Sequence, residues 1–478
     1  MPRDAKHFAE RGSANRIPKP LLLIGAILFL VCSSIVSYVQ IIQAYLNQPN
    51  HVSGVTTNQI SLPMPCRSIG GDTSEFAVNL CHDENTCRGY VEIRHVANCT
   101  EAGRLSDDPD TEAFLKKNCG PDAYEIKFIQ HEVVVARAQY KGYCRHIAPY
   151  QLSIPGWHSL FVRHLYQGYE AVTEYFDRRQ PKWNAHYHKN KLISRPVDDV
   201  SCIHPTLDRA TRTRQVGKGI VLPDTTSKPV CQSATETGRW VYAAPNQWEW
   251  DPYNCTYPTL QWSREKGAKC LDGRVITFLG DSQQRSIYYA FLNRVSPTKI
   301  ANNPKAMGGR IDQVGNITLV YHTDPWLDKA ACWYATLNGT KRTDVFVAGF
   351  GNWPAAGSIG AQGKWSDKKY RAHAQLKASE LLAFKASSPE VLIYWLGMPA
   401  FPHPPIDSRR NNQRLLHMVQ SAADAMKAVG IPVVDSYQFS EGMTGTSLDG
   451  SHYVNHVTAS IAAAILSENC RELGHIKA

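Results

Sequence analysis

The stretch RVITFLGDSQQRSIYYAF, residues 274–291, decides the fold of the larger part of this 478-residue chain. Its first seven residues, RVITFLG, are a compact apolar run that predicts a buried strand. Helical spacing follows from Ser282 to Val295, with apolar side chains at Ile287, Ala290 and Phe291. A strand that turns directly into a helix is the repeating unit of a parallel α/β sheet.

The same pattern recurs downstream. We expect further buried strands at 344–350, 390–397 and 431–435, and helices at about 366–386, 409–429 and 455–468. Strands that alternate with helices predict a doubly wound parallel sheet with helices on both faces. The sequence therefore predicts an α/β domain over residues 231–478.

The chain before this domain has a different character. Short runs rich in β-formers at 124–140 and 157–176, together with closely spaced cysteines, predict a smaller antiparallel, disulfide-rich β-domain over 66–177. Residues 47–65 are polar and read as a stem. The proline-containing and basic stretch 178–230 is expected to be a linker.

The N-terminus predicts a membrane anchor. Residues 20–46 contain no Asp, Glu, Lys or Arg. This uncharged stretch is long enough to span a bilayer and is longer than the apolar core of a cleaved signal peptide. A basic tail over 1–19 precedes them, and positive charge stays cytoplasmic, so we expect type II topology with everything after the anchor lumenal. A cleaved signal peptide and a buried core helix are the alternatives.

Composition excludes a disordered, collagenous or coiled-coil protein, because 43% of the residues are hydrophobic and no residue type is strongly over-represented. The net charge of +10 comes from two stretches, residues 1–19 with five basic and two acidic residues, and residues 178–218 with ten basic and three acidic ones. Nucleic acid is therefore not an expected partner. The second stretch is expected to be a solvated connector or, alternatively, a basic wall that attracts an acidic glycan or donor.

Cysteines and sequons agree with a lumenal body. Cys32 lies inside the predicted span, and the remaining twelve cysteines are disulfide candidates in an oxidising compartment, with no CxxC pair to favour zinc: Cys66, Cys81, Cys87, Cys99, Cys119, Cys144, Cys202, Cys231, Cys255, Cys270, Cys332 and Cys470. Glycosylation is expected at the sequons of Asn98, Asn254, Asn316 and Asn338.

The turn Gly280-Asp281-Ser282 is the expected reaction site, because ligands of a doubly wound sheet bind at the carboxyl ends of its strands. Ser282 opens a helix, whose free N–H groups can stabilise an oxyanion. A serine nucleophile needs a base, and the D-x-x-H of Asp449 and His452 supplies an imidazole with a carboxylate to orient it.

Other interpretations of these residues stay open. Ser282 also fits an ordinary helix cap, Asp449 a turn and His452 a surface position. Asp449, His452 and His456 have a spacing that could hold a hydrolytic metal, although we expect no metal. Arg285 lies one helical turn from Ser282, where it is either a substrate-binding residue or a solvated helix residue.

The chain resembles the PC-esterase branch of the SGNH/GDSL hydrolase superfamily, which includes trichome-birefringence-like, Cas-type and neurexophilin-and-PC-esterase proteins. The resemblance covers about 231–478 and is carried, besides residues 274–291 and the late DGSH, by these motifs: GRWV (238–241), CLDGR (270–274), NITLVYHTDPWL (316–327) and FVAGFGNW (346–353).

This resemblance implies roles for single residues. Ser282 would be the nucleophile, His452 the general base and Asp449 its orienter. The oxyanion hole would combine Ser282 with a glycine, matched less securely by Gly309, and with Asn352, where plant relatives often carry another residue.

The resemblance implies a Golgi-membrane O-acetyltransferase that acts on a glycan or polysaccharide, with an acetyl donor, of which acetyl-CoA is one candidate, as co-substrate and no bound cofactor. The alternatives are a lumenal or secreted carbohydrate acetylesterase, in which water replaces the sugar, and a catalytically silent binding protein related to neurexophilins.

Overall fold

The chain divides into two compact units, Met1–Gln59 and Ile60–Ala478. The computed structural model describes parts of the second unit only, namely residues 64–70, 75–96, 122–142, 144–166, 188–194, 197–203, 213–216, 220–223, 228–244, 247–301, 308–329, 343–356, 365–402, 410, 412–447, 449, 451–453 and 456–476. The predicted tail, anchor and nearly all of the predicted stem therefore lie outside the described residues. None of the described helices combines the length and apolarity needed to cross a bilayer.

The described strands of the C-terminal part form a six-stranded sheet with the order β16-β17-β15-β18-β19-β20. All neighbours pair in parallel except β16, which runs antiparallel to β17. The bounds are β15 Val275–Gly280, β16 Arg310–Val314, β17 Ile317–Thr323, β18 Val345–Ala348, β19 Leu392–Leu396 and β20 Val433–Val434. The predicted strands are confirmed, whereas the β16–β17 hairpin was not predicted.

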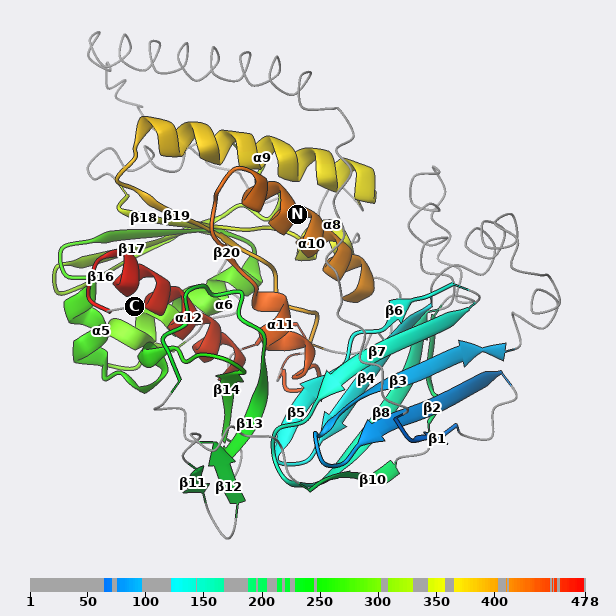
Figure 1. The fold of residues 1–478 in the computed structure, drawn as a ribbon. Helices are drawn as coiled ribbons and strands as arrows, with labels where there is room; N and C mark the ends of the chain where they lie inside the picture. The colour runs from blue at the N-terminus through cyan, green and yellow to red at the C-terminus, as the bar shows by residue number, and fades with distance from the viewer. Residues whose placement is uncertain are drawn as a thin grey trace, which may run out of the picture. The chain divides into compact units, whose positions relative to one another are not determined.

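Helices cover both faces of this sheet, as predicted (Figure 1). In the view of Figure 1, α9 and α10 lie on one face, and α5, α6 and α12 lie on the other. The bounds are η4 Pro258–Gln261, α5 Arg264–Cys270, α6 Ser282–Val295, α8 Asn352–Ala356, α9 Asp367–Ser387, α10 Asn412–Ala428, α11 Ser436–Glu441 and α12 His456–Glu472. The three predicted helices after residue 366 are thus confirmed.

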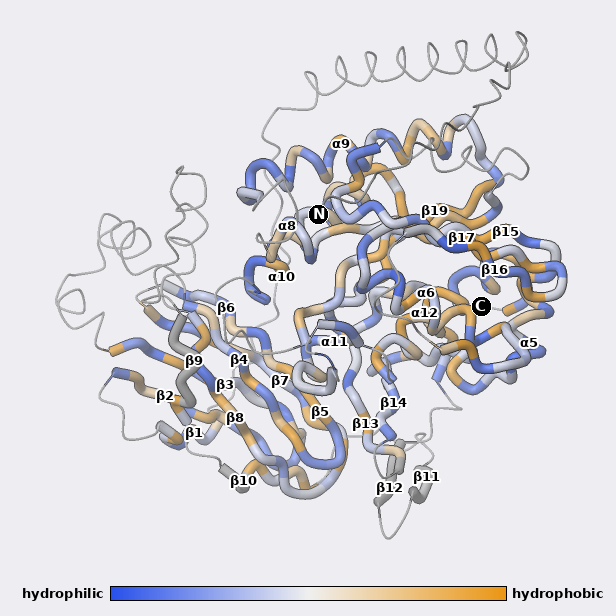
Figure 2. The backbone as a smooth tube through the Cα atoms, turned by 180° about the vertical axis from the view of Figure 1, so that it is seen from behind, coloured by the Kyte–Doolittle hydropathy of each residue, from blue (hydrophilic) through white to orange (hydrophobic). Residues whose placement is uncertain are grey.

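The core of this part explains why these segments form these elements. Every residue of β15 and β18 is buried. The colouring of Figure 2 shows β15 and β19 as largely hydrophobic, whereas α9 alternates between hydrophobic and hydrophilic. A strand buried on both faces needs a continuous apolar run, and a covering helix needs only one apolar side. β15 lies between β17 and β18. The strands that follow β15 in the chain are therefore placed first on one side of it and then on the other, and the carboxyl end of β15 is the point where the strand order reverses.

The described strands before residue 203, together with β13 (Gly238–Ala244) and β14 (Gln247–Pro252), form an antiparallel sandwich. One sheet has the order β1-β2-β3-β7-β6, and the other has the order β10-β8-β4-β5-β13-β14, with β9 paired to β8. Apolar side chains of both sheets share one core. The bounds are β1 Cys66–Ser68, β2 Phe76–Asp83, β3 Arg88–His95, β4 Ala123–Ile129, β5 Glu132–Val135, β6 Gln139–Tyr140, β7 Arg145–Gln151, β8 Gly156–Tyr166, β9 His188–Leu192 and β10 Val197–Cys202.

The prediction of a linker over residues 178–230 is wrong, because this segment contains paired strands. Its strands β9 and β10 pair with β8 and extend the sandwich, and β11 (Thr213–Val216) pairs with β12 (Ile220–Pro223). Proline and charge suggested a connector, but an edge strand tolerates both because half of its backbone groups need no partner in the sheet.

The predicted boundary at residue 231 is also wrong in one respect. β13 (Gly238–Ala244) pairs with β14 (Gln247–Pro252) and, on its other side, with β5 of the sandwich. The same hairpin packs into the α/β core, where the Trp240 indole donates to the Phe439 carbonyl at 2.9 Å. The backbone of the hairpin therefore belongs to a sheet of the sandwich, whereas its Trp240 and Trp250 side chains belong to the core of the α/β part.

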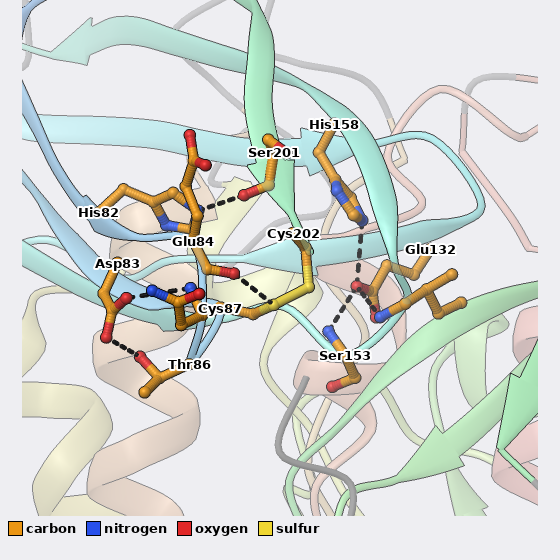
Figure 3. The surroundings of a disulfide bond; sticks show 12 residues. His82, Asp83, Glu84, Thr86, Cys87, Glu132, Ser153, His158, Ser201 and Cys202 are labelled. Carbon is orange, nitrogen blue, oxygen red and sulfur yellow. Dashed lines mark hydrogen bonds and ion pairs between the residues drawn. A yellow bond between two sulfur atoms is a disulfide. The ribbon is translucent and has the colours of Figure 1, made fainter. Parts of the chain in front are cut away.

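A buried ionic network fixes this joint. Glu132 of β5 is fully buried and contacts the Arg239 guanidinium of β13 at 2.9 Å, and Arg239 also contacts Asp251 of β14 at 2.7 Å. Figure 3 shows Glu132 accepting bonds from the Ser153 backbone N–H and from His158, near the Cys87–Cys202 disulfide. A buried charge is tolerated only when it is paired in this way.

Four disulfides join described cysteines: Cys66–Cys81, Cys87–Cys202, Cys231–Cys255 and Cys270–Cys470. Cys144 is also disulfide-bonded, whereas Cys99, Cys119 and Cys332 lie outside the described residues.

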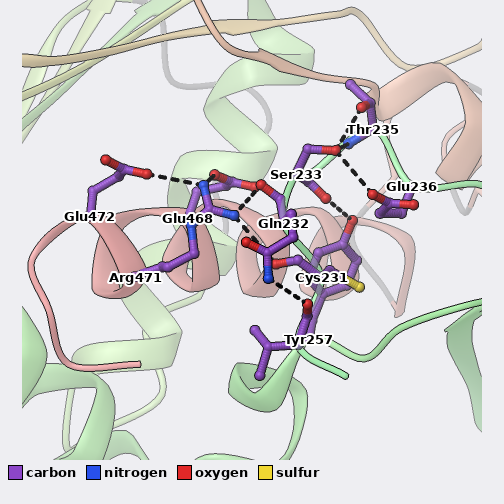
Figure 4. A network of polar contacts seen from close by, with 10 residues as sticks. Cys231, Gln232, Ser233, Thr235, Glu236, Tyr257, Glu468, Arg471 and Glu472 are labelled. Atoms are coloured by element: carbon purple, nitrogen blue, oxygen red, sulfur yellow. Dashed lines mark hydrogen bonds and ion pairs between the residues drawn. The ribbon is translucent and has the colours of Figure 1, made fainter. Parts of the chain in front are cut away.

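Figure 4 shows how the end of α12 is held, with Arg471 bonded to Glu468 at 2.6 Å, to Glu472 at 3.0 Å and to the Gln232 carbonyl. Of the predicted glycosylation sites, Asn254 and Asn316 are exposed, and Asn98 and Asn338 lie outside the described residues.

Candidate active site

The turn between β15 and α6 is compact because no side chain fits at Gly280. A Cβ added there would lie 1.6 Å from the Gln284 side-chain oxygen and 2.6 Å from the Gly349 carbonyl. The Tyr321 hydroxyl donates to the Asp281 carbonyl at 2.7 Å and holds the turn from the neighbouring strand β17. Ser282 follows as the first residue of α6 and is partly exposed.

Asp281 caps α6 and is itself buried. One oxygen of its carboxylate accepts the backbone N–H of Gln283 at 2.9 Å and that of Gln284 at 3.4 Å. Burial is the largest influence and raises the pKa of the Asp281 carboxyl to about 6, although these two N–H groups, His452 and Arg285 lower it. A buried carboxyl with a raised pKa thus lies directly behind the predicted nucleophile.

The loop before α12 presents His452. Asp449 accepts the backbone N–H groups of Ser451 and His452, both at 2.8 Å, on one oxygen, and the Ser447 hydroxyl donates to the His452 carbonyl at 2.8 Å. Burial raises the pKa of the Asp449 carboxyl, but the bonds from His452 and Ser451 outweigh it and bring the pKa down to about 2. Asp449 is therefore ionised at neutral pH.

The structure brings Ser282, His452 and Asp449 together. The His452 Nδ1 lies 2.7 Å from the second oxygen of Asp449, and the His452 Nε2 lies 2.8 Å from the Ser282 hydroxyl oxygen. These are the two hydrogen bonds that a serine nucleophile and its base require, in the chain order Ser, Asp, His. The interpretation of these residues as a cap, a turn and a surface position does not account for such a relay.

The two predicted oxyanion residues lie at the same edge of the sheet. Gly309 directly precedes β16, whose Arg310 pairs with Tyr321 of β17, and the neighbouring Gly308 carbonyl accepts from Thr323 at 2.9 Å. Asn352 follows β18 and is buried, and its side-chain N–H donates to the Pro399 carbonyl at 3.1 Å. Their role as oxyanion donors stays a prediction.

Two side chains differ from the alternatives weighed for them. Arg285 is not a solvated helix residue, because it is 4% exposed and acts electrostatically on Asp281. His456 packs edge-on against Trp240 at 5.0 Å between ring centroids, and burial lowers its pKa to about 4. Among the described residues, Asp449, His452 and His456 do not assemble a metal-binding group.

Sequence reasoning missed two supporting residues. The Gln283 amide donates to the Ser451 carbonyl and ties α6 to the His452 loop across 168 residues of sequence. Tyr321 supports the Ser282 turn from β17. Of the residues that hold the Ser282 turn, only Asp281 had a local sequence signal, because an aspartate before a helical run is a favoured cap.

A parallel α/β sheet that carries a Ser–His–Asp relay at the carboxyl end of its central strand defines an enzyme of the esterase or acyltransferase type. No protein-family model matches the chain, and the search of curated proteins finds no match either.

Among solved structures, the chain is similar to LAE5, an alpha/beta hydrolase from the metagenome of Lake Arreo in Spain, at 16% identity and a TM-score of 0.30, over 43% of this chain and 98% of that one. It is also similar to two variants of Axe2 from Geobacillus stearothermophilus. One is described as an acetyl-xylooligosaccharide esterase and matches at 14% identity and a TM-score of 0.29, over 42% of this chain and 95% of that one. The other is described as an acetyl xylan esterase and matches at 15% identity and a TM-score of 0.28, over 43% of this chain and 97% of that one. At these values the likeness carries no conclusion about activity or substrate. The PC-esterase branch stays a prediction.

Proposed function

We propose that the chain is a glycan O-acetyltransferase that works through an acetyl-serine on Ser282. The observation that carries the proposal is the continuous relay from the Ser282 hydroxyl through both nitrogens of His452 to Asp449, at 2.8 and 2.7 Å. An ionised Asp449 stabilises the imidazolium that forms when His452 accepts the serine proton.

The first half-reaction forms the acetyl-enzyme. His452 Nε2 takes the proton of the Ser282 hydroxyl while its oxygen attacks the acetyl carbonyl of the donor. The resulting oxyanion is stabilised by the backbone N–H of Ser282 at the start of α6, with Gly309 and Asn352 as further candidate donors. Collapse breaks the bond to the donor, which leaves with the proton from His452.

The second half-reaction reverses these roles. His452 takes the proton of a sugar hydroxyl, the sugar oxygen attacks the acetyl carbon, and Ser282 leaves as its hydroxyl with the proton returned from His452. The kinetics are expected to be ping-pong, because the donor departs before the acceptor reacts.

A carbohydrate acetylesterase is the second candidate, and the exposure of the relay favours it. The Asp449 side chain is 44% exposed and that of His452 15% exposed. Water can therefore reach the base, and water in place of the sugar hydroxyl turns the same chemistry into hydrolysis.

The deciding experiment supplies an isotope-labelled acetyl donor together with candidate glycans to the purified full chain. Label on the sugar supports transfer, and label found only in free acetate supports the esterase. Mass spectrometry of the Ser282 peptide after donor alone should show acetyl-serine, and its absence from an active preparation would refute the covalent mechanism. A Ser282→Ala chain is the control for non-enzymatic acetylation.

We also propose that the chain is a single-pass type II protein of the Golgi membrane. The support is the uncharged stretch 20–46 after a basic tail. A glycosylation reporter fused to the C-terminus should be modified, and an unmodified reporter would reverse the topology.

A further inference from the structure

Two histidines and an aspartate meet inside the sandwich, far along the chain from the relay. His95 ends β3, Asp122 directly precedes β4, and His164 lies on β8. Their exposed fractions are 5%, 7% and 2%. One potential ligand atom from each of the three lies within 4.8 Å of the other two.

Both rings place a nitrogen close to the same carboxylate oxygen. The His95 Nδ1 lies 2.7 Å from the Asp122 Oδ2, and the His164 Nε2 lies 3.1 Å from it. A tetrahedral zinc ion with bonds of about 2.0–2.1 Å holds its ligand atoms about 3.4 Å apart. The three side chains therefore need only a small outward movement to bind an ion between them.

The surroundings resemble the outer shell of a metal centre. The Tyr124 hydroxyl donates to the Asp122 Oδ2 at 3.3 Å. Tyr124 is thus a donor that orients the carboxylate. Carboxylates that bind metals are commonly held by such hydrogen bonds.

A third histidine lies next to these residues. The His146 ring is 2% exposed and packs edge-on against the Tyr124 ring at 4.9 Å between centroids. Among the described side chains, neither of its ring nitrogens has a hydrogen-bond partner.

The geometry points to a structural zinc site formed by His95, Asp122 and His164. His146 lies outside this group and would have to move to supply a fourth ligand. Imidazole and carboxylate ligands without a thiolate suit zinc among the divalent metals. The ion would join β3 of one sheet to β8 of the other, because His95 and His164 come from opposite sides of the shared core. Its burial makes it a structural ion and not a second catalytic centre.

The test measures metal on the purified full chain in detergent, prepared with an affinity tag that contains no histidine. Elemental analysis after dialysis should find about one zinc per chain. Removal by a chelator should lower the melting temperature, and added Zn²⁺ should restore it. Co²⁺ added to the apo-chain should produce visible absorption bands typical of a four-coordinate site.

Two substitutions address the ligands directly. Asp122→Asn keeps the size of the side chain, and His164→Asn keeps a polar group in the sheet. Each should weaken zinc binding at least about tenfold, measured against a competing chromophoric chelator. His158→Asn is the matched control, because His158 is equally buried in the same sandwich and bonded to a carboxylate, yet lies outside the cluster; it should keep its zinc.

The outcomes are separable. A wild-type chain without stoichiometric metal and without a zinc-dependent melting temperature overturns the site, even if the variants fail to fold. Equal zinc content in the wild type, Asp122→Asn and His158→Asn would mean an adventitious ion only. None of these readouts depends on acetyl transfer, so failure of the zinc site and failure of the proposed reaction are distinguishable.

Discussion

Asp281→Asn should stabilise the chain at neutral and alkaline pH, although it changes the residue next to the nucleophile. The Asp281 carboxyl is 1% exposed, and burial raises its pKa from 3.8 to about 6. The folded chain thus holds this proton more tightly than the unfolded chain does. The resulting stabilisation is complete below about pH 4 and is lost as the pH rises through 6.

The size of the effect follows from the shift. A difference of about two pKa units corresponds to about 3 kcal/mol between the protonated and ionised folded states. Asparagine does not titrate and caps helices about as well as aspartate. It also places an N–H near the position of the acid proton, so an unsatisfied donor there is common to the variant and to the wild type at pH 4. For a unit that spans Ile60–Ala478, 3 kcal/mol corresponds to a rise of about 3–4 °C in melting temperature.

The assay is calorimetry of both chains at pH 4 and pH 8, with the difference between variant and wild type taken at each pH. The difference should be small at pH 4 and large at pH 8. Asp435→Asn is the control, because Asp435 also caps a helix, by accepting from the Gln438 N–H at 3.3 Å. A variant that is less stable than wild type at pH 8, or a difference that ignores pH, would refute the reasoning.

Three further changes probe the relay and the joint between the sheets. Asn352→Ala should lower kcat by about 10²–10³-fold with little change in KM, if its amide serves the oxyanion; steady-state kinetics decide this. Asp449→Asn should lower kcat by as much as about 10⁴-fold, the loss known for the equivalent change in serine proteases, because His452 then loses its ionised partner; the burst of acetyl-serine should slow in proportion. Glu132→Gln should cost about 3–5 kcal/mol in urea denaturation, because it leaves the buried Arg239 without its full counter-charge.

Each of these changes has a control. Ser447→Ala removes a hydroxyl from the His452 loop without removing the Asp449 charge and should cost far less activity than Asp449→Asn. Glu92→Gln breaks a partly exposed pair with Arg145 and should cost less than about 1 kcal/mol. An equal loss of stability in Glu92→Gln and Glu132→Gln would show that burial of the pair is not what matters. For Asn352→Ala, an unchanged kcat would remove the amide from the oxyanion hole.

The α/β sheet and the relay were predictable because their signals are local. β15 is six consecutive buried residues, and Asp449 lies three residues before His452. The joint was not predictable, since β13 finds its partner β5 more than a hundred residues earlier in the chain. The cluster of His95, Asp122 and His164 was missed for the same reason, because its members come from separate segments of the chain and show no motif.

The pairing of β13 with β5 has a consequence for synthesis on the ribosome. About a hundred residues separate the end of β5 at Val135 from the start of β13 at Gly238. At roughly 5–20 residues per second, the edge of β5 waits about 5–20 s for its partner. During that time the nascent sandwich presents an open strand edge, which is a template for aggregation. Glu132, which later becomes the buried partner of Arg239, places a charge on that edge while it is still open.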